Sequence, residues 1–373
     1  MREAVKIRTK KRFAGAITTA FSAYAAFCAL AFPARTAESV VAALKLSVSA
    51  VVPTLVVFVT AYKILAPALT AAFAKMKRLQ RFFAVSPGGM CMIAAGLLSG
   101  FPTGSVVYAA LRKSGSISER EGESLMPFCN NAGAAFLIGS VGTKMFGYAP
   151  YGVALFAFQA VAALTMILLT RRERRCACEA PAIEREAITP SGAAKAIADG
   201  GLTMLGVTAF IVFFAVIGDA LTADLKLGGY IGALLSCVLE ISGGMNALSR
   251  LGALGAATGG FAVGFSGLSV YMQCHFAAGG EGMRKYFFGK LATSAVCGAM
   301  TAAFCAFGEK AAFFEYFGDA SAGAKNAALI LVSAAIFCSC AFLTVVVGAK
   351  IAEKIKKSEK LQKMSGKKRR DDI

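Results

Sequence analysis

The sequence predicts an all-α polytopic membrane protein, built from two internal repeats that contain re-entrant or broken helices. Of the 373 residues, 57% are hydrophobic and only 16% are charged, whereas about 25% of residues are charged in an ordinary soluble domain. The apolar residues come in blocks about as long as one membrane crossing, which needs about 20 residues. Short basic or glycine-rich segments separate the blocks. Together these observations exclude a soluble globular protein.

Several apolar blocks have the length of a complete membrane span. They are residues 13–32, 40–65, 151–170, 197–220, 227–246 and 327–347. The first block follows a basic start, as in a signal peptide, but its apolar part runs for about 20 residues and more spans follow. We therefore expect it to remain in the protein as a first helix, and we expect the lipid bilayer to be the main surrounding of the chain.

The net charge of +19 is concentrated at the ends of apolar blocks, within residues 2–12, 75–81, 171–175 and 350–370. Positive charge beside membrane spans marks the cytoplasmic side. We therefore expect both termini in the cytoplasm and no nucleic acid partner. If residues 75–81 and 171–175 share one side, an odd number of crossings must lie between residues 85 and 147. That region has two apolar stretches, so one of them is predicted to be re-entrant.

Two apolar regions, residues 85–147 and 251–307, contain breaks. The first contains Ser99-Gly-Phe-Pro-Thr-Gly-Ser105, and the second contains Gly264-Phe-Ser-Gly-Leu-Ser269. Both match Gly-Phe-x-x-x-Ser-Val, which suggests an internal repeat. The predicted organisation is an N-terminal membrane repeat (residues 1–170), a cytoplasmic linker (171–195), a C-terminal membrane repeat (196–349) and a basic cytoplasmic tail (350–373).

The breaks predict a solute site near the middle of the membrane. Non-helical backbone at that depth is tolerated only where it is buried in protein or lines a cavity, and paired breaks in two repeats are typical of transporter binding sites. Helix N-termini at a break offer N–H groups to an anion. The alternative is that the glycines only allow close helix packing. The candidate substrate-binding residues are Gly100, Pro102, Thr103, Gly104, Ser105, Asn130, Asn131, Ser266, Gly267, Ser269 and Gln273.

Glu240 is the carboxylate deepest in an apolar block. An ionisable group in the membrane is costly and is a functional candidate by default. We expect Glu240 to couple or gate transport, and a structural hydrogen bond is the alternative. The neighbouring amides of Asn130 and Asn131 have a similar ambiguity, because they could cap a helix or bind a solute.

The sequence gives little basis for an enzyme. Gly264-Phe-Ser-Gly matches the Gly-x-Ser-Gly of intramembrane serine proteases, but the only histidine, His275, lies in or next to the same helix as Ser266. There is no phosphate-binding loop and no His-Glu-x-x-His zinc motif. Most of the 11 cysteines lie in apolar blocks, where a free cysteine acts as a small hydrophobic residue. We expect no catalytic activity and no cofactor.

Several motifs together resemble one known family. They are Gly96-Leu-Leu-Ser-Gly-Phe-Pro-Thr-Gly-Ser105, Phe128-Cys-Asn-Asn131, Leu137-Ile-Gly-Ser-Val-Gly142, Gly267-Leu-Ser-Val270 with Gln273, and Glu240 with Gly243. The chain resembles the YlbJ or SpoVV sporulation integral membrane proteins, whose repeated unit is the nucleoside-recognition or Gate domain. One departure is Ala134, where the family tends to have proline.

This resemblance implies a transporter in the outer forespore membrane that passes dipicolinate, a small planar dianion, from the mother cell into the forespore. Nucleoside transport is the first alternative, because the Gate domain is named for its likeness to nucleoside carriers. A membrane scaffold for spore cortex formation, which transports nothing, is the second. A homo-oligomer is compatible with any of these functions.

Overall fold

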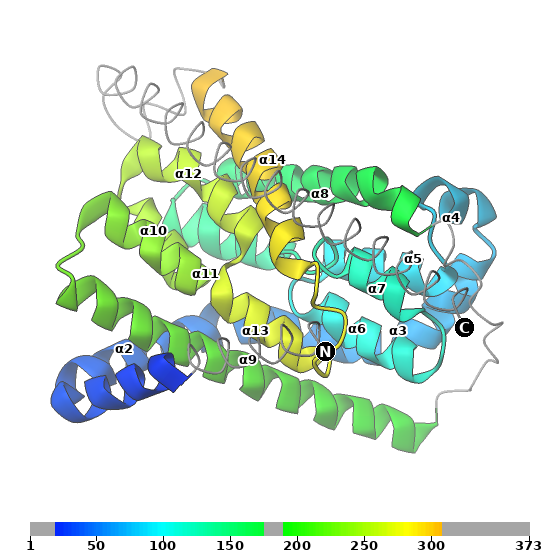
Figure 1. Cartoon of the computed structure of the whole chain (residues 1–373), viewed down its shortest axis with the longest axis horizontal. Coiled ribbons are helices and arrows are strands. Elements are labelled where there is room, and N and C mark those ends of the chain that lie inside the picture. Colours follow the sequence, from blue (N-terminus) through cyan, green and yellow to red (C-terminus); the bar gives the residue numbers. More distant parts are fainter. Residues whose placement is uncertain (1–18, 175–188, 308–373) are drawn as a thin grey trace, which may run out of the picture.

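The computed structural model describes residues 19–174 and 189–307, and every regular element in these ranges is a helix (Figure 1). This confirms the predicted all-α class. Among the described residues, five helices are long and apolar enough to cross a membrane, or up to seven if each of two bent pairs is one span. The predicted span at residues 327–347 and the C-terminal tail lie outside the described residues, as does most of the linker.

The N-terminal part differs from the two spans predicted there. Helix Thr19–Ala31 bends by 115° into Pro33–Val51, because Phe32 is not helical (φ −133°, ψ 60°) and Pro33 cannot continue the hydrogen-bond ladder of the preceding helix. Helix α2 (Pro33–Leu46), the π-helix η1 (Ser47–Val51) and α3 (Val52–Ala74) follow without a loop. The boundaries predicted at residues 40–65 are therefore wrong, since the apolar span begins at Leu55.

A re-entrant hairpin follows α3 and the short helix α4 (Lys77–Phe83). It consists of α5 (Pro87–Leu98) and α6 (Thr103–Lys113), with residues 99–102 at its tip. Ser86 starts α5, and its hydroxyl accepts a hydrogen bond from the Gly89 N–H at 3.1 Å. Gly88 at the start of α5 lies against Ser116, just after α6. The chain therefore returns to the end of the molecule from which it came.

A discontinuous helix and a long helix complete the first half. Helix α7 (Glu119–Leu125) gives way to a mostly non-helical segment at residues 126–134, and the π-helix η2 (Ala135–Met145) continues from it. Helix α8 (Ala149–Leu169) then packs against η2 and ends in the 3-10 helix η3 (Thr170–Glu173). Gly142 and Gly152 are in close contact there.

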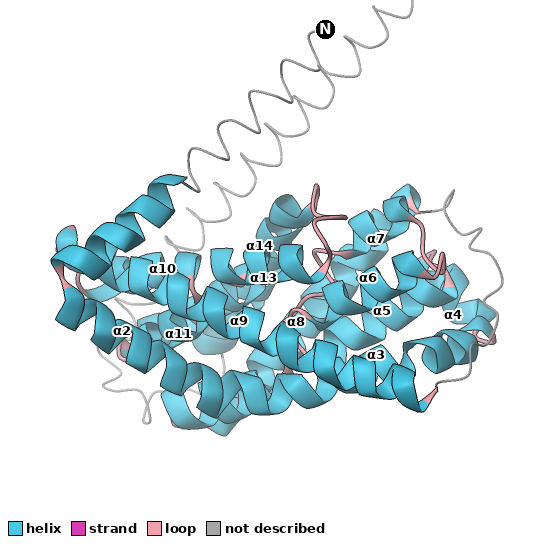
Figure 2. Ribbon diagram, turned by 90° about the horizontal axis from the view of Figure 1, so that it is seen from below, coloured by secondary structure: helices cyan, strands magenta, loops and turns pink. Residues whose placement is uncertain are grey.

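The second half begins with α9 (Pro190–Asp224), which runs beside both α2 and α3 (Figures 1 and 2). Helices α10 (Gly229–Leu239) and α11 (Ile241–Ser249) follow, and then the discontinuous pair α12 (Gly252–Phe265) and α13 (Gly267–Ala277). Helix α14 (Tyr286–Phe307) packs along α12. The single span predicted at residues 227–246 is wrong, because the helix breaks at Glu240, whose backbone is extended (φ −144°, ψ 118°).

The order of elements is the same in both halves: a long helix, a hairpin, a discontinuous helix and a long helix. The first series is α3, α5–α6, α7–η2 and α8, and the second is α9, α10–α11, α12–α13 and α14. The shared Gly-Phe-x-x-x-Ser-Val motif therefore does not mark equivalent elements: it lies at the hairpin tip in the first half and at the break of the discontinuous helix in the second. By order, the hairpin tip at residues 99–102 corresponds to Glu240, and the break at Ser266 corresponds to residues 126–134.

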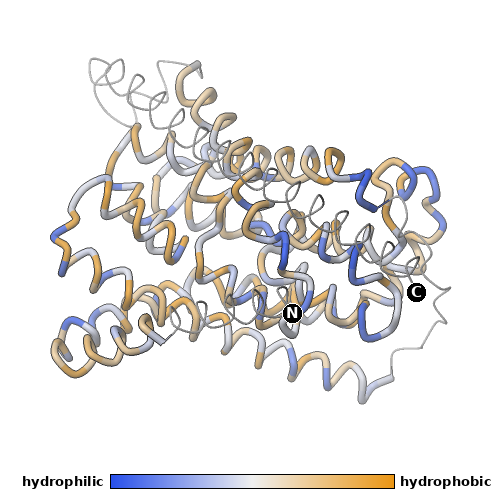
Figure 3. The backbone as a smooth tube through the Cα atoms, viewed as in Figure 1, coloured by the Kyte–Doolittle hydropathy of each residue, from blue (hydrophilic) through white to orange (hydrophobic). Residues whose placement is uncertain are grey.

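Two of the basic clusters fall within the described residues, at 75–81 and 171–174, and they lie at one end of the molecule, where the tube in Figure 3 is most hydrophilic. Arg174 joins them, although its side chain is fully buried. Its guanidinium donates hydrogen bonds to the carbonyl of Phe83 at 3.1 Å and to the hydroxyls of Thr170 at 2.9 Å and Ser124 at 3.4 Å. Residues 75–81 and the end of α8 therefore share one side, as the sequence predicted.

Replacing Arg174 should destabilise this end strongly. Arg174→Ala removes a charged donor and leaves buried acceptors without partners, so we expect a loss of about 3 kcal/mol in unfolding free energy. Thermal unfolding of the purified protein measures this loss. The matched control is Arg172→Ala, because Arg172 is exposed. Equal melting temperatures for the two variants would contradict the role given to Arg174.

Candidate functional site

In the first half, the hairpin tip encloses the break of the discontinuous helix. A Cβ on Gly96 or on Gly104 would overlap the backbone of Cys129, and Gly100 at the tip (φ 104°) lies against Gly133. Pro102 and Thr103 stand at the start of α6. The sequence motif thus provides the close backbone contact that only glycine permits, which was the packing alternative for these residues.

Asn130 stabilises the N-terminus of α6. Its side-chain oxygen accepts hydrogen bonds from the Ser105 N–H at 3.0 Å and the Ser105 hydroxyl at 3.1 Å, and its amide donates to the Met126 carbonyl at 2.9 Å. Asn130 therefore holds the tip and the break together. Asn131 donates to the Phe128 carbonyl at 2.7 Å, and its buried side-chain oxygen has no partner among the described residues.

The second half repeats this arrangement. Ser266 (φ 72°) separates α12 from α13, which begins at Gly267 (φ 84°). A Cβ on Gly267 would lie 3.0 Å from the Cys237 carbonyl oxygen, so this break packs on the tip of the α10–α11 hairpin. Glu240 forms that tip and is 4% exposed. Its carboxylate accepts hydrogen bonds from the backbone N–H groups of Ser242 at 3.0 Å and Gly243 at 2.6 Å, which compensates for part of the cost of burial.

A small cavity lies where the two halves meet. The space open to the centre of a water-sized probe is about 20 Å³, which is room for about one water molecule. Of the candidate residues, Glu240 and Gln273 line it. Gln273 donates to the Ser269 hydroxyl at 3.1 Å, while its buried oxygen has no partner within residues 19–174 and 189–307. The other lining residues are Val51, Leu55, Ser99, Phe101, Gly133, Ala135, Phe136, Ile211 and Ser242.

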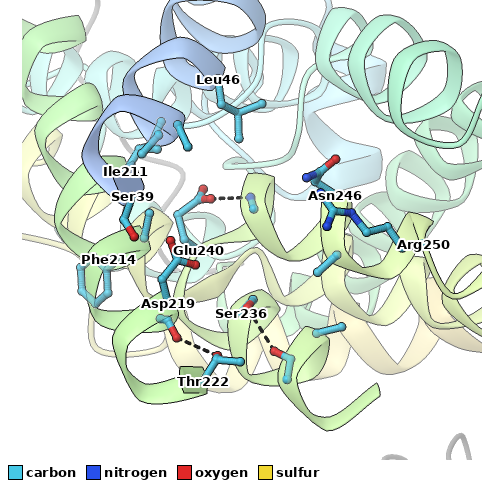
Figure 4. A pocket seen from close by; sticks show the side chains of 18 of the residues that line it. Ser39, Leu46, Ile211, Phe214, Asp219, Thr222, Ser236, Glu240, Asn246 and Arg250 are labelled. Atoms are coloured by element: carbon cyan, nitrogen blue, oxygen red, sulfur yellow. Dashed lines mark hydrogen bonds between the residues drawn. The ribbon is translucent and has the colours of Figure 1, made fainter. Parts of the chain in front are cut away.

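A much larger open cavity, about 820 Å³, reaches Glu240 from the other side. It lies between α2, α9, α10 and α11 and is lined by the charged residues Lys45, Asp219 and Arg250 as well as Glu240. Figure 4 shows Glu240 and Asp219 in one part of this cavity and Asn246 and Arg250 across from them. We call it the vestibule. Glu240 therefore lines both the vestibule and the small central cavity and lies at the boundary between them.

Lys290 is a site residue that the sequence analysis missed. It is 1% exposed, and its ammonium donates hydrogen bonds to the Asn130 carbonyl in one break and to the Ser266 hydroxyl, at 3.3 Å, in the other. Lys290 is the one charged residue of α14. An isolated charge in an apolar run is the signal that could have found it.

Ser266 and His275 are not joined by any hydrogen bond among the described residues. The Ser266 hydroxyl donates to the Val263 carbonyl at 3.0 Å and accepts from Lys290. The half-exposed ring of His275 stacks on Tyr271, with 6.1 Å between the ring centroids. The protease motif therefore corresponds here to a helix break.

No family model, curated protein or solved structure matches the chain.

Proposed function

We propose that the protein is a transporter of a small organic anion, and that the anion is dipicolinate, carried from the mother cell into the forespore across the outer forespore membrane. The observation that carries the proposal is the meeting of two hairpin tips, the break at residues 126–134 and helix α13 around one small cavity. Buried polar groups and irregular backbone at membrane depth are costly, so their concentration at one point favours a solute path.

The two cavities favour alternating access to that path. The vestibule is large enough for a small solute, whereas the central cavity holds about one water molecule. A dipicolinate ion must therefore displace the hairpin tips to reach Gln273. The structure then corresponds to a conformation that is closed around the central site, with Glu240 at the boundary.

The chemistry of the centre suits an anion. The first residues of η2, Ala135 and Phe136, line the central cavity, and a helix N-terminus attracts negative charge. Lys290 adds a positive charge behind the breaks. The resemblance to sporulation membrane proteins supports dipicolinate as the anion.

Glu240 then couples anion entry to a proton. Two like charges about 4 Å apart repel by roughly 4 kcal/mol at an effective dielectric constant of about 20. A dianion beside Glu240 is therefore favoured only when this carboxyl is protonated. The other charged groups of the vestibule are Lys45, Asp219 and Arg250, and their formal charges leave the cavity without a strong excess of either sign.

Nucleoside transport is the second candidate. The unpartnered side-chain oxygens of Gln273 and Asn131 suit the hydroxyl and amino donors of a neutral nucleoside. A scaffold without transport activity is the third, and it requires no solute to move.

Uptake into proteoliposomes tests these candidates with radiolabelled dipicolinate and uridine in parallel. We expect dipicolinate to enter and uridine not to enter. Gln273→Leu should lower dipicolinate uptake at least about tenfold, which corresponds to about 1.4 kcal/mol, because it removes the amide N–H donors beside the central cavity. The matched control is Gln159→Leu, because Gln159 is equally buried with an unpartnered oxygen but lines neither cavity. Uptake of uridine alone would favour the nucleoside carrier, and uptake of neither would favour the scaffold.

A further inference from the structure

The surroundings of Lys290 are those of a bound cation. Its ammonium lies between the two discontinuous helices and contacts one backbone carbonyl and one hydroxyl, from Asn130 and Ser266. Carbonyl and hydroxyl oxygens are the ligands that proteins offer to hard cations. None of the five ion pairs among the described residues includes Lys290. The charge is therefore held by neutral oxygen atoms.

Both oxygen atoms lie at the C-terminal end of a half-helix. The hydrogen-bonded turn that follows α7 ends at Cys129, whose N–H donates to the Leu125 carbonyl at 3.0 Å, and Asn130 comes next. Helix α12 ends at Phe265, and Ser266 caps it through an N–H bond to the Ala262 carbonyl at 2.8 Å. The C-terminal end of a helix carries a partial negative charge, so the two half-helices act on the ammonium together.

In transporters with discontinuous helices, unwound carbonyls and the C-terminal ends of half-helices coordinate the coupling cation. The ammonium of Lys290, which extends from α14, lies at such a position, next to an unwound carbonyl and the C-terminal end of a half-helix. Lys290 lines neither the central cavity nor the vestibule. This argues against direct contact between its ammonium and a solute in this conformation.

We infer that Lys290 is a tethered cation, which occupies the position of a coupling ion where the two discontinuous helices meet. The two breaks are then held together without Na⁺, and the ion that drives transport acts elsewhere, at Glu240. The consequence for coupling rests on the transport function proposed above, whereas the stabilising role of the charge does not.

The test is thermal unfolding of the purified full-length protein in chloride salts of choline, Na⁺, ammonium and methylammonium at equal ionic strength. The wild-type protein should melt at the same temperature in Na⁺ and choline. Lys290→Ala should melt roughly 5–10 °C lower than the wild type in choline chloride. Part of this loss should be recovered in the salt of a small cation that fits the position left by the ammonium. Lys290→Met should lose stability without recovery, because its side chain fills the position without a charge.

The matched control is Lys285→Ala, since Lys285 is half-exposed and pairs with Glu173. It should show neither the loss nor the recovery. Stabilisation of the wild type by Na⁺ over choline would overturn the inference, and this result does not depend on any variant. A Lys290→Met variant as stable as the wild type would also overturn it, as would a Lys290→Ala variant that no small cation rescues. The same melting pattern in a protein that transports neither solute would contradict only the proposed function.

Discussion

Proton-driven uptake of dipicolinate should fall at least about tenfold in Glu240→Gln, while exchange of dipicolinate across the membrane without a gradient should continue. Glutamine has the shape of a protonated glutamate, and its oxygen can still accept a hydrogen bond from the Ser242 or Gly243 backbone. It cannot release a proton. Exchange by the variant should therefore not depend on the protonation of this side chain, whereas wild-type exchange should rise as the pH falls.

The control for this experiment is a second buried carboxyl. Glu121 is fully buried at the basic end of the molecule and accepts a hydrogen bond from the Ser86 N–H at 2.6 Å. It lies outside the two cavities, so Glu121→Gln should keep the pH dependence of the wild type. A Glu240→Gln variant with the same pH profile as the wild type would remove Glu240 from the coupling step.

Gly104→Ala should abolish uptake and lower the unfolding free energy by about 3 kcal/mol. The added methyl group overlaps the Cys129 carbonyl oxygen, which is backbone and cannot turn away. Relief requires the hairpin tip to separate from the break, and this weakens the contacts between Asn130 and Ser105. Uptake and thermal unfolding measured on one preparation give both quantities.

Gly201→Ala is the matched control, because a Cβ on Gly201 in α9 meets no atom within 4 Å. Alanine favours a helix over glycine by about 1 kcal/mol, so this variant should be as stable as the wild type or more stable. Normal uptake by Gly104→Ala would show that the tip can separate from the break without loss of transport. This would contradict the requirement for close contact between Gly104 and Cys129.

Composition and block length were sufficient to predict the helical class, and the charge distribution predicted a re-entrant stretch. The breaks at residues 99–102 and at Ser266 were also predictable, because glycine and proline interrupt an apolar run there. The break at Glu240 was not, since neither of its neighbours in the sequence, Leu239 and Ile241, is a glycine or a proline. Helix α10 ends there because the Glu240 side chain caps the N-terminus of α11. Such capping depends on three-dimensional geometry.

The correspondence of the two halves could not be derived from a short motif. Gly-Phe-x-x-x-Ser-Val occurs at a hairpin tip and again at a discontinuous helix because both places need small residues for close backbone contact. Lys290 was missed for a related reason. Its partners, Asn130 and Ser266, are distant in the sequence, and only the folded chain brings them to one point.

The vestibule also has an electrical consequence. Under the proposed transport function, water would fill this cavity of about 820 Å³ as far as Glu240 and would conduct far better than the surrounding lipid. The membrane potential would therefore fall mainly across the closed layer between Glu240 and the opposite surface. Moving one elementary charge through 100 mV is worth about 2.3 kcal/mol. A dianion that travels with one proton would carry a net negative charge through this concentrated field, so its movement would constitute a current.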